Sequence, residues 1–144
     1  MKLLLPGDGE QFDACRALAG ELGVDDRVVF PGLLSDVRAA LRAADAAVSS
    51  SRSEGLPFNV MEAMLSSLPV IATGVKGHTD LVEPGVTGLL YPYDDRAALA
   101  RAVETLLHDP ELRVSMGQRG RQRVERFTLP QVYEAVMREY QSVL

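Results

Sequence analysis

The chain has 144 residues, of which 47% are hydrophobic and 24% are charged, and this composition is typical of one ordinary globular domain. Its net charge of −5 excludes the basic face that nucleic-acid binding requires, so we expect no nucleic-acid partner. The single cysteine cannot form an internal disulfide, and no apolar run approaches the roughly 20 residues of a membrane-spanning helix. We therefore expect a soluble cytoplasmic domain; peripheral attachment of a parent protein to a membrane stays open.

Short apolar runs alternate with amphipathic stretches along the chain. The runs predict strands at 2–5, 28–30, 46–49, 69–72 and 88–91, and the stretches predict helices at 11–22, 36–43, 57–67, 78–82, 96–107, 110–127 and 130–143. The strand candidates do not alternate strictly, which is typical of strands covered on both faces. This order of elements predicts an α/β fold, a doubly wound parallel sheet of about five strands with a helical C-terminal tail, as a single domain over residues 1–144.

Residues with known preferences at helix ends agree with these boundaries. Asp8 or Gly9 is expected to cap the first helix, and Gly23 is expected to end it. Asp94 or Asp95 is expected to cap the helix after the last strand. In a doubly wound sheet the ligand lies at the carboxyl ends of the strands, so a functional site is expected in the loops that lead from strands into helices.

The most informative of these loops is SSSRSEGLPFNVMEAM, residues 49–64. Pro57 suits the first turn of a helix, and Gly55 allows a ligand to approach the backbone closely. The amides of Phe58, Asn59 and Val60 then have no partner within the helix. Together with the helix dipole, these amides predict a site for an anion such as a phosphate.

Two carboxylates flank this predicted anion site. Glu54 precedes the helix, and Glu62 lies about 7.5 Å along the axis from Pro57, at about 1.5 Å per residue. A carboxylate accepts hydrogen bonds from neighbouring hydroxyls of a ribose or a sugar, so the pair suits a nucleotide-diphosphate-sugar. The competing interpretation treats both glutamates as solvated helix charges. The glycine, the proline and the strand on each side favour the ligand site.

Several motifs in the same order resemble the retaining family-four glycosyltransferases, which have the GT-B architecture. Two glutamates separated by seven residues are followed by Ala63-Met64 and by PVIAT at 69–73. The segments LPGDGE at 5–10, DRVVFPG at 26–32 and VTGLL at 86–90 resemble further strands and loops of that family. The resemblance covers nearly the whole chain and is looser at KGHTD, 76–80, where many members have two glycines and a later glutamate.

This resemblance implies roles for individual residues. Glu54 contacts the donor sugar and is the candidate catalytic residue, whereas Glu62 binds the ribose hydroxyls. The sugar and the diphosphate are held by backbone amides in a donor-binding segment that consists of Gly55, Leu56, Pro57, Phe58 and Asn59. The base lies along the main chain of a second segment, which consists of Phe30, Pro31, Gly32 and Leu33.

The resemblance also implies that the chain is the C-terminal, donor-binding half of a longer GT-B enzyme with Rossmann-like domains. Its substrate is a UDP- or GDP-linked sugar, which is transferred to a glycan or lipid in surface polysaccharide biosynthesis without a cofactor or a metal ion. The first strand of the domain, whose Arg and Lys neutralise the diphosphate, and the N-terminal acceptor domain are expected to lie outside this chain. The isolated chain is therefore expected to be inactive, and self-association through its partner face stays open. Two alternatives also stay open: a non-catalytic module that docks on a separate N-terminal domain, and a related nucleotide-sugar epimerase.

The remaining polar residues receive ordinary interpretations. His78 is interpreted as an exposed loop histidine, and with His108 far away in the sequence it predicts no metal site. Ser49 lacks the pattern of a hydrolase nucleophile and is expected to satisfy backbone groups at a strand end. Arg52 and Lys76 are interpreted as surface charges or as partial replacements for the diphosphate-binding cations. A solvated basic face is expected for Arg119, Arg121, Arg123 and Arg126.

Overall fold

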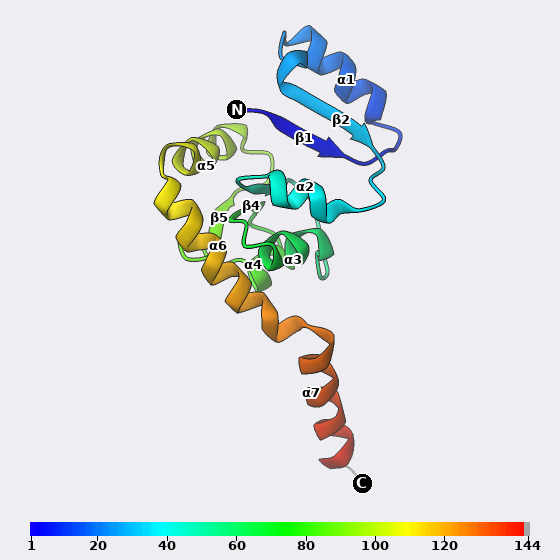
Figure 1. Ribbon diagram of the computed structural model, residues 1–144, viewed down its shortest axis with the longest axis vertical. Helices are drawn as coiled ribbons and strands as arrows, with labels where there is room; N and C mark the ends of the chain where they lie inside the picture. The colour runs from blue at the N-terminus through cyan, green and yellow to red at the C-terminus, as the bar shows by residue number, and fades with distance from the viewer. Residues whose placement is uncertain (143–144) are drawn as a thin grey trace. The chain divides into compact units, whose positions relative to one another are not determined.

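The computed structural model describes residues 1–142 of the chain. These residues form two compact units, Met1–Ala39 and a second unit that begins at Ala40, and each contains a parallel sheet (Figure 1). The parallel strands and the helices between them confirm the predicted α/β class. Hydrogen bonds join the strands as one two-stranded and one three-stranded sheet, where the sequence predicted a single sheet of about five strands.

The first unit is a strand–helix–strand arrangement. Its elements are β1 (Leu3–Pro6), α1 (Phe12–Glu21), the 3₁₀ helix η1 (Asp25–Arg27) and β2 (Val28–Gly32). The strands pair in parallel, with Leu3 opposite Val28. A helix that connects two parallel strands is the usual crossover of α/β proteins.

The two ends of α1 differ in how well the sequence predicts them. The expectation that Asp8 or Gly9 caps this helix is wrong: Gln11 precedes the helix and makes no side-chain capping bond. The Asp8 carboxylate instead accepts a hydrogen bond from the Gly9 amide at 2.8 Å, because the chain makes a further turn before the helix begins. Gly23 follows the helix with a φ of +64°, the left-handed conformation typical of a glycine that ends a helix, so this prediction is confirmed.

The second unit contains the other three strands and most of the helices. Helix α2 (Val37–Ala43) leads into it. The following elements are β3 (Ala47–Ser49), α3 (Phe58–Leu65), β4 (Val70–Thr73), α4 (His78–Leu81), β5 (Gly88–Tyr91), α5 (Arg96–His108), α6 (Pro110–Val124), the 3₁₀ helix η2 (Glu125–Phe127) and α7 (Leu129–Ser142). The strands are parallel in the order β3-β4-β5. The predicted end of the last helix at residue 143 lies outside the described residues.

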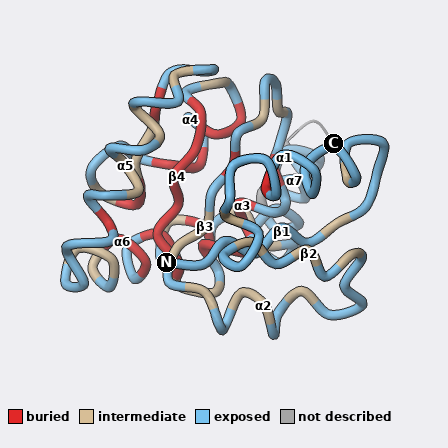
Figure 2. The backbone as a smooth tube through the Cα atoms, turned by 90° about the horizontal axis from the view of Figure 1, so that it is seen from above, coloured by how far each residue is buried: buried red, intermediate tan, exposed pale blue. Residues whose placement is uncertain are grey.

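The core of the second unit is built around β4, whose four residues are all buried (Figure 2). Val70 and Ala72 belong to a cluster that includes Met64 of α3 and Val124 of α6. Ile71 belongs to a second cluster with residues of α5 and α6. A strand with a neighbour on each side and helices on both faces exposes nothing, and β4 is accordingly apolar up to its last residue, Thr73.

The helices of this unit begin at residues of the expected kind. Asp95 precedes α5, and its Oδ1 accepts a hydrogen bond from the Ala98 amide at 2.8 Å, which confirms the predicted cap. Pro57 has a φ of −75° and a ψ of 101°, so it is the residue before α3 and not the first residue of its first turn. Phe58 therefore begins the helix, one residue later than predicted.

Arg123 contradicts the prediction of a solvated basic face. It is partly buried in α6, and its Nε donates a hydrogen bond to the Leu81 carbonyl at 2.6 Å. Its Nη1 donates to Oε2 of Glu83 at 3.2 Å, and its Nη2 donates to the Asp80 carbonyl at 3.3 Å. A helix leaves its last carbonyls without helical partners, and Arg123 supplies partners at the end of α4.

Helix α7 follows η2 and is exposed over the positions whose side chains are described. Its apolar side chains include Leu129, Tyr133 and Tyr140. None of the helices within residues 1–142 combines the length and the apolar character that crossing a membrane requires.

Candidate functional site

The predicted donor-binding segment lies at the carboxyl end of β3 and at the start of α3. Helix α3 buries one face, which consists of Val60, Met61, Ala63 and Met64. The opposite face, with Phe58, Asn59 and Glu62, is exposed, because positions three and four apart lie on the same side of a helix. The structure therefore places Glu62 on an open face, one turn beyond Asn59.

The N-terminal end of α3 has no side-chain cap. The first bond of the α-helical kind at this end runs from the Met61 amide to the Pro57 carbonyl at 3.1 Å. The amides of Phe58, Asn59 and Val60 precede it and have no partner within the helix. Three amides and the positive end of the helix dipole thus lie next to the loop that carries Glu54, an arrangement that suits a phosphate.

Glu54 differs from Glu62 in its surroundings. Glu54 lies in the loop before α3 and is partly buried, whereas Glu62 is exposed. Within residues 1–142, neither carboxylate takes part in an ion pair.

The loop after β4 packs directly against Glu54. Gly77 has a φ of +89°, and a Cβ atom placed on it would lie 2.7 Å from the Gly55 carbonyl oxygen and 2.9 Å from the Cβ of Glu54. Only glycine combines this conformation with such close contact. The sequence left the role of 76–80 open, and the structure shows that Gly77 of this loop packs against Glu54 and Gly55.

His78 is not the exposed loop histidine that the sequence predicted. It is fully buried, at 0% exposure, as the first residue of α4. Its Nε2 lies 3.0 Å from Oγ of Ser49, the last residue of β3, and its Nδ1 lies 2.9 Å from the carbonyl oxygen of Thr73, the last residue of β4. The prediction failed because a polar residue between Gly77 and Thr79 has the same local pattern whether it faces solvent or the sheet.

The Ser49–His78 contact has the separation of a nucleophile and its base, but its burial excludes that chemistry. Ser49 is 6% exposed and His78 is 0% exposed, so no substrate carbonyl reaches the hydroxyl. The expectation for Ser49 also needs correction, because its hydroxyl bonds to a side chain that lies 29 residues away in the sequence.

The other predicted segment lies in the first unit. Phe30, Pro31 and Gly32 are the last residues of β2, and Leu33 follows the strand. The Phe30 ring packs edge to face on the Phe12 ring, with centroids 5.8 Å apart. A shallow hollow beside the carboxyl ends of both strands is lined by 5–9, Gln11, Phe12, Cys15 and Phe30.

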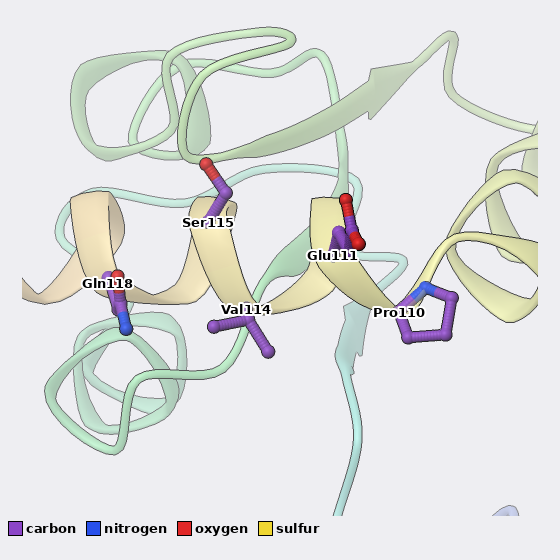
Figure 3. Close-up of a pocket in the computed structure, with 5 residues that line it drawn as sticks. All are labelled: Pro110, Glu111, Val114, Ser115 and Gln118. Atoms are coloured by element: carbon purple, nitrogen blue, oxygen red, sulfur yellow. The ribbon is translucent and has the colours of Figure 1, made fainter.

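A further hollow lies away from the motif. Figure 3 shows it on α6, where all five labelled residues come from this one helix: Pro110, Glu111, Val114, Ser115 and Gln118. A surface formed by one helix face does not enclose a ligand. Among the described residues, no group of three His, Cys, Asp or Glu side chains is arranged to hold a metal ion.

Comparison with known proteins assigns the family. The profile of the family described as Glycosyl transferases group 1 matches residues 1–123. The chain belongs to this family. The resemblance seen in the sequence, which rested on the two glutamates and the strands around them, is thereby confirmed.

Relatives in the family are longer than this chain. EpsD of Bacillus subtilis (strain 168) is 36% identical over 144 residues, which are 100% of this chain and 38% of EpsD. The lipopolysaccharide core biosynthesis glycosyltransferase LpsE of Rhizobium meliloti (strain 1021) is 37% identical over 118 residues, which are 82% of this chain and 35% of LpsE. The chain thus spans less than half the length of these glycosyltransferase-family relatives.

Solved structures share the fold. Sucrose-phosphate synthase from Thermosynechococcus elongatus matches 99% of this chain and 38% of its own, with a TM-score of 0.88 and 33% identity. HepE of Anabaena, solved in complex with UDP-glucose, matches 98% of this chain and 41% of its own, with a TM-score of 0.89 and 26% identity. These matches support the GT-B, Rossmann-like assignment for the group 1 glycosyltransferase chain.

Proposed function

We propose that this chain binds a nucleotide-diphosphate-sugar at the N-terminal end of α3 and forms the donor-binding half of a retaining glycosyltransferase. The observation that carries the proposal is the similarity to HepE, a structure solved with UDP-glucose, over 98% of the chain. The relative LpsE, by its name a lipopolysaccharide core glycosyltransferase, supports a glycan or lipid acceptor in surface polysaccharide biosynthesis.

The diphosphate is placed at the uncapped end of α3. The Phe58 and Asn59 amides face no helical partner, and both residues are exposed. The Leu56 amide belongs to the same turn, between Gly55 and the helix. Amides aimed at an anion need no rearrangement when it binds, so this end of the helix is organised before the donor arrives.

The two glutamates take separate parts of the donor. Glu62, on the open face of α3, accepts hydrogen bonds from the ribose hydroxyls. Glu54, partly buried and supported by Gly77, contacts the sugar. A carboxylate repels phosphate oxygens but accepts hydrogen bonds from neutral hydroxyls. Both glutamates are therefore assigned to hydroxyls on either side of the diphosphate and not to the phosphates.

The base is assigned to the segment Phe30–Leu33 at the end of β2. Main-chain contacts there do not select the base, so both UDP-linked and GDP-linked sugars are candidates. HepE was solved with UDP-glucose, which makes a UDP-sugar the first donor to test.

Sugar transfer is assigned to the longer protein. The chain covers 38% of EpsD, which leaves room for an N-terminal Rossmann-like domain that holds the acceptor.

The test separates the two carboxylates by titrating the ¹⁵N-labelled chain with UDP, GDP and ADP and following the amide signals. Glu62→Ala removes charge-assisted bonds and is expected to weaken nucleotide binding by about tenfold to a hundredfold. Glu54→Ala is expected to change it little or to strengthen it, because a carboxylate near the phosphates is lost. Glu104→Ala, an exposed glutamate on α5, is the matched control and should change nothing.

Two outcomes contradict these roles. Equal losses from Glu54→Ala and Glu62→Ala refute the division between sugar and ribose. Amide shifts that avoid Gly55–Glu62 refute the site itself.

A further inference from the structure

We propose that His78 is a positioning residue of the donor site: through a directed series of hydrogen bonds it sets the backbone that carries Glu54. This inference rests on the proposed donor site, since it explains how that site is held. It concerns a residue that touches no substrate, because His78 is 0% exposed.

The imidazole of His78 bridges the ends of two neighbouring strands. Ser49 ends β3 and Thr73 ends β4, and the ring contacts both. Its Nε2 lies 3.0 Å from Oγ of Ser49, and its Nδ1 lies 3.0 Å from Oγ1 and 2.9 Å from the carbonyl oxygen of Thr73. Since functional loops follow the carboxyl ends of parallel strands, His78 joins the bases of two of them.

The partners of the ring determine its tautomer. A carbonyl oxygen only accepts hydrogen bonds, so Nδ1 carries the hydrogen and donates it to Thr73. The Thr73 hydroxyl hydrogen is already donated to the Ser51 carbonyl at 2.6 Å, which leaves Oγ1 as a further acceptor for Nδ1. In the neutral ring Nε2 then accepts from the Ser49 hydroxyl. The hydrogen bonds therefore run in one direction, from Ser49 through His78 and Thr73 to Ser51.

This series of hydrogen bonds ends at Ser51, three residues before Glu54. A second contact holds the same loop at Glu54 itself. Gly77, the neighbour of His78 in the sequence, packs so closely on Glu54 and Gly55 that it has no room for a Cβ atom. The loop between β3 and α3 is thus held at Ser51 through a hydrogen bond and at Glu54 and Gly55 through close contact with Gly77. His78 acts on the first point, because its ring hydrogen-bonds to Thr73, whose hydroxyl donates to the Ser51 carbonyl.

Substitutions that imitate one ring nitrogen at a time separate this role from simple stability. An asparagine amide at 78 reaches the place of Nδ1 and preserves donation to Thr73. A glutamine side chain reaches further, to the place of Nε2, and preserves the bond with Ser49 only. If His78 only stabilises the fold, the two substitutions should have similar effects on ligand binding. If it acts through Thr73, His78→Asn should be tolerated and His78→Gln should not.

The experiment compares UDP with UDP-glucose on the ¹⁵N-labelled chain, with urea unfolding of each variant measured in parallel. His78→Gln is expected to weaken UDP-glucose binding by about tenfold and UDP binding by less than about twofold, since only the sugar uses Glu54. His78→Asn should remain within about threefold of the unmodified chain for both ligands. Thr87→Val, which removes another buried hydroxyl that bonds to the Glu83 amide at 2.9 Å, is the matched control and should leave the ratio of the two affinities unchanged.

Measurements without ligand keep the inference separate from the proposed function. In the unmodified chain, ring ¹⁵N spectra should show hydrogen on Nδ1, and a hydrogen on Nε2 overturns the inference with no variant needed. The Glu54 and Gly55 amide signals should move in His78→Gln and stay in His78→Asn. If the unmodified chain binds neither ligand, the donor site is refuted, while these signals still decide whether His78 positions Glu54. Equal losses for both ligands from both His78 variants, with the Glu54 and Gly55 signals unmoved, overturn it as well.

Discussion

Replacing Gly77 with alanine perturbs the close contact that this residue makes with Glu54 and Gly55. The residue has a φ of +89° and a ψ of −54°, a conformation that disfavours any L-amino acid. The added methyl group would lie 2.7 Å from the Gly55 carbonyl oxygen and 2.9 Å from both Cβ and the carbonyl oxygen of Glu54. Real Cβ atoms do not approach other atoms so closely, so Glu54 and Gly55 must move.

The expected loss of stability in Gly77→Ala has two parts that a control variant can separate. A left-handed conformation costs a non-glycine residue about 1–2 kcal/mol, and overpacking against a backbone adds about 1–3 kcal/mol. Gly85 has a φ of +75° and nothing within 4 Å of its Cβ position, so Gly85→Ala carries the first part alone. We expect a loss of about 2–5 kcal/mol from Gly77→Ala and of about 1–2 kcal/mol from Gly85→Ala.

Urea unfolding, followed through amide signals of the second unit, measures both losses. The signals of Glu54 and Gly55 should move in Gly77→Ala and remain in place in Gly85→Ala. Equal losses of stability in the two variants, with the Glu54 signal unmoved, refute the close packing described for this loop.

Four further predictions concern Tyr91, Arg123 and the activity of the chain. The Tyr91 hydroxyl is buried without a hydrogen-bond partner among the described residues, so Tyr91→Phe should raise the free energy of unfolding in urea by about 1 kcal/mol; a loss of stability contradicts this. Burial also raises the pKa of Tyr91, so above about pH 10 the unfolded chain releases this proton first, and stability should fall with rising pH in the parent chain more than in Tyr91→Phe. Arg123→Met removes partners from carbonyls at the end of α4 and should cost about 1–3 kcal/mol in urea unfolding, whereas Arg121→Met, whose ion pair is exposed, should cost less than about 1 kcal/mol; equal costs refute the distinction. The purified chain alone should transfer no sugar from UDP-glucose, because transfer requires donor and acceptor held together, and measurable turnover would show that it suffices.

Local pattern determined much of this protein from the sequence alone. The last strand was predicted at 88–91 and occupies Gly88–Tyr91, because an apolar run bounded by a turn leaves few alternatives. Glu54, Gly55 and Pro57 before an apolar helix identified the candidate ligand loop and the resemblance to the glycosyltransferase family. Such a motif consists of neighbouring residues, so the sequence alone displays it. Composition and net charge predicted a single-domain globular class without a nucleic-acid partner, because such predictions require no knowledge of contacts.

Only the tertiary structure decided the surroundings of the site. His78 was assigned to solvent and is buried on Ser49, 29 residues away, and Arg123 was assigned to a solvated face and bonds to Leu81, 42 residues away. Gly77 packs on Glu54, which also lies far from it in the sequence. Burial of a polar side chain depends on whether distant groups satisfy its hydrogen bonds, and a sequence window of one helix contains none of those groups.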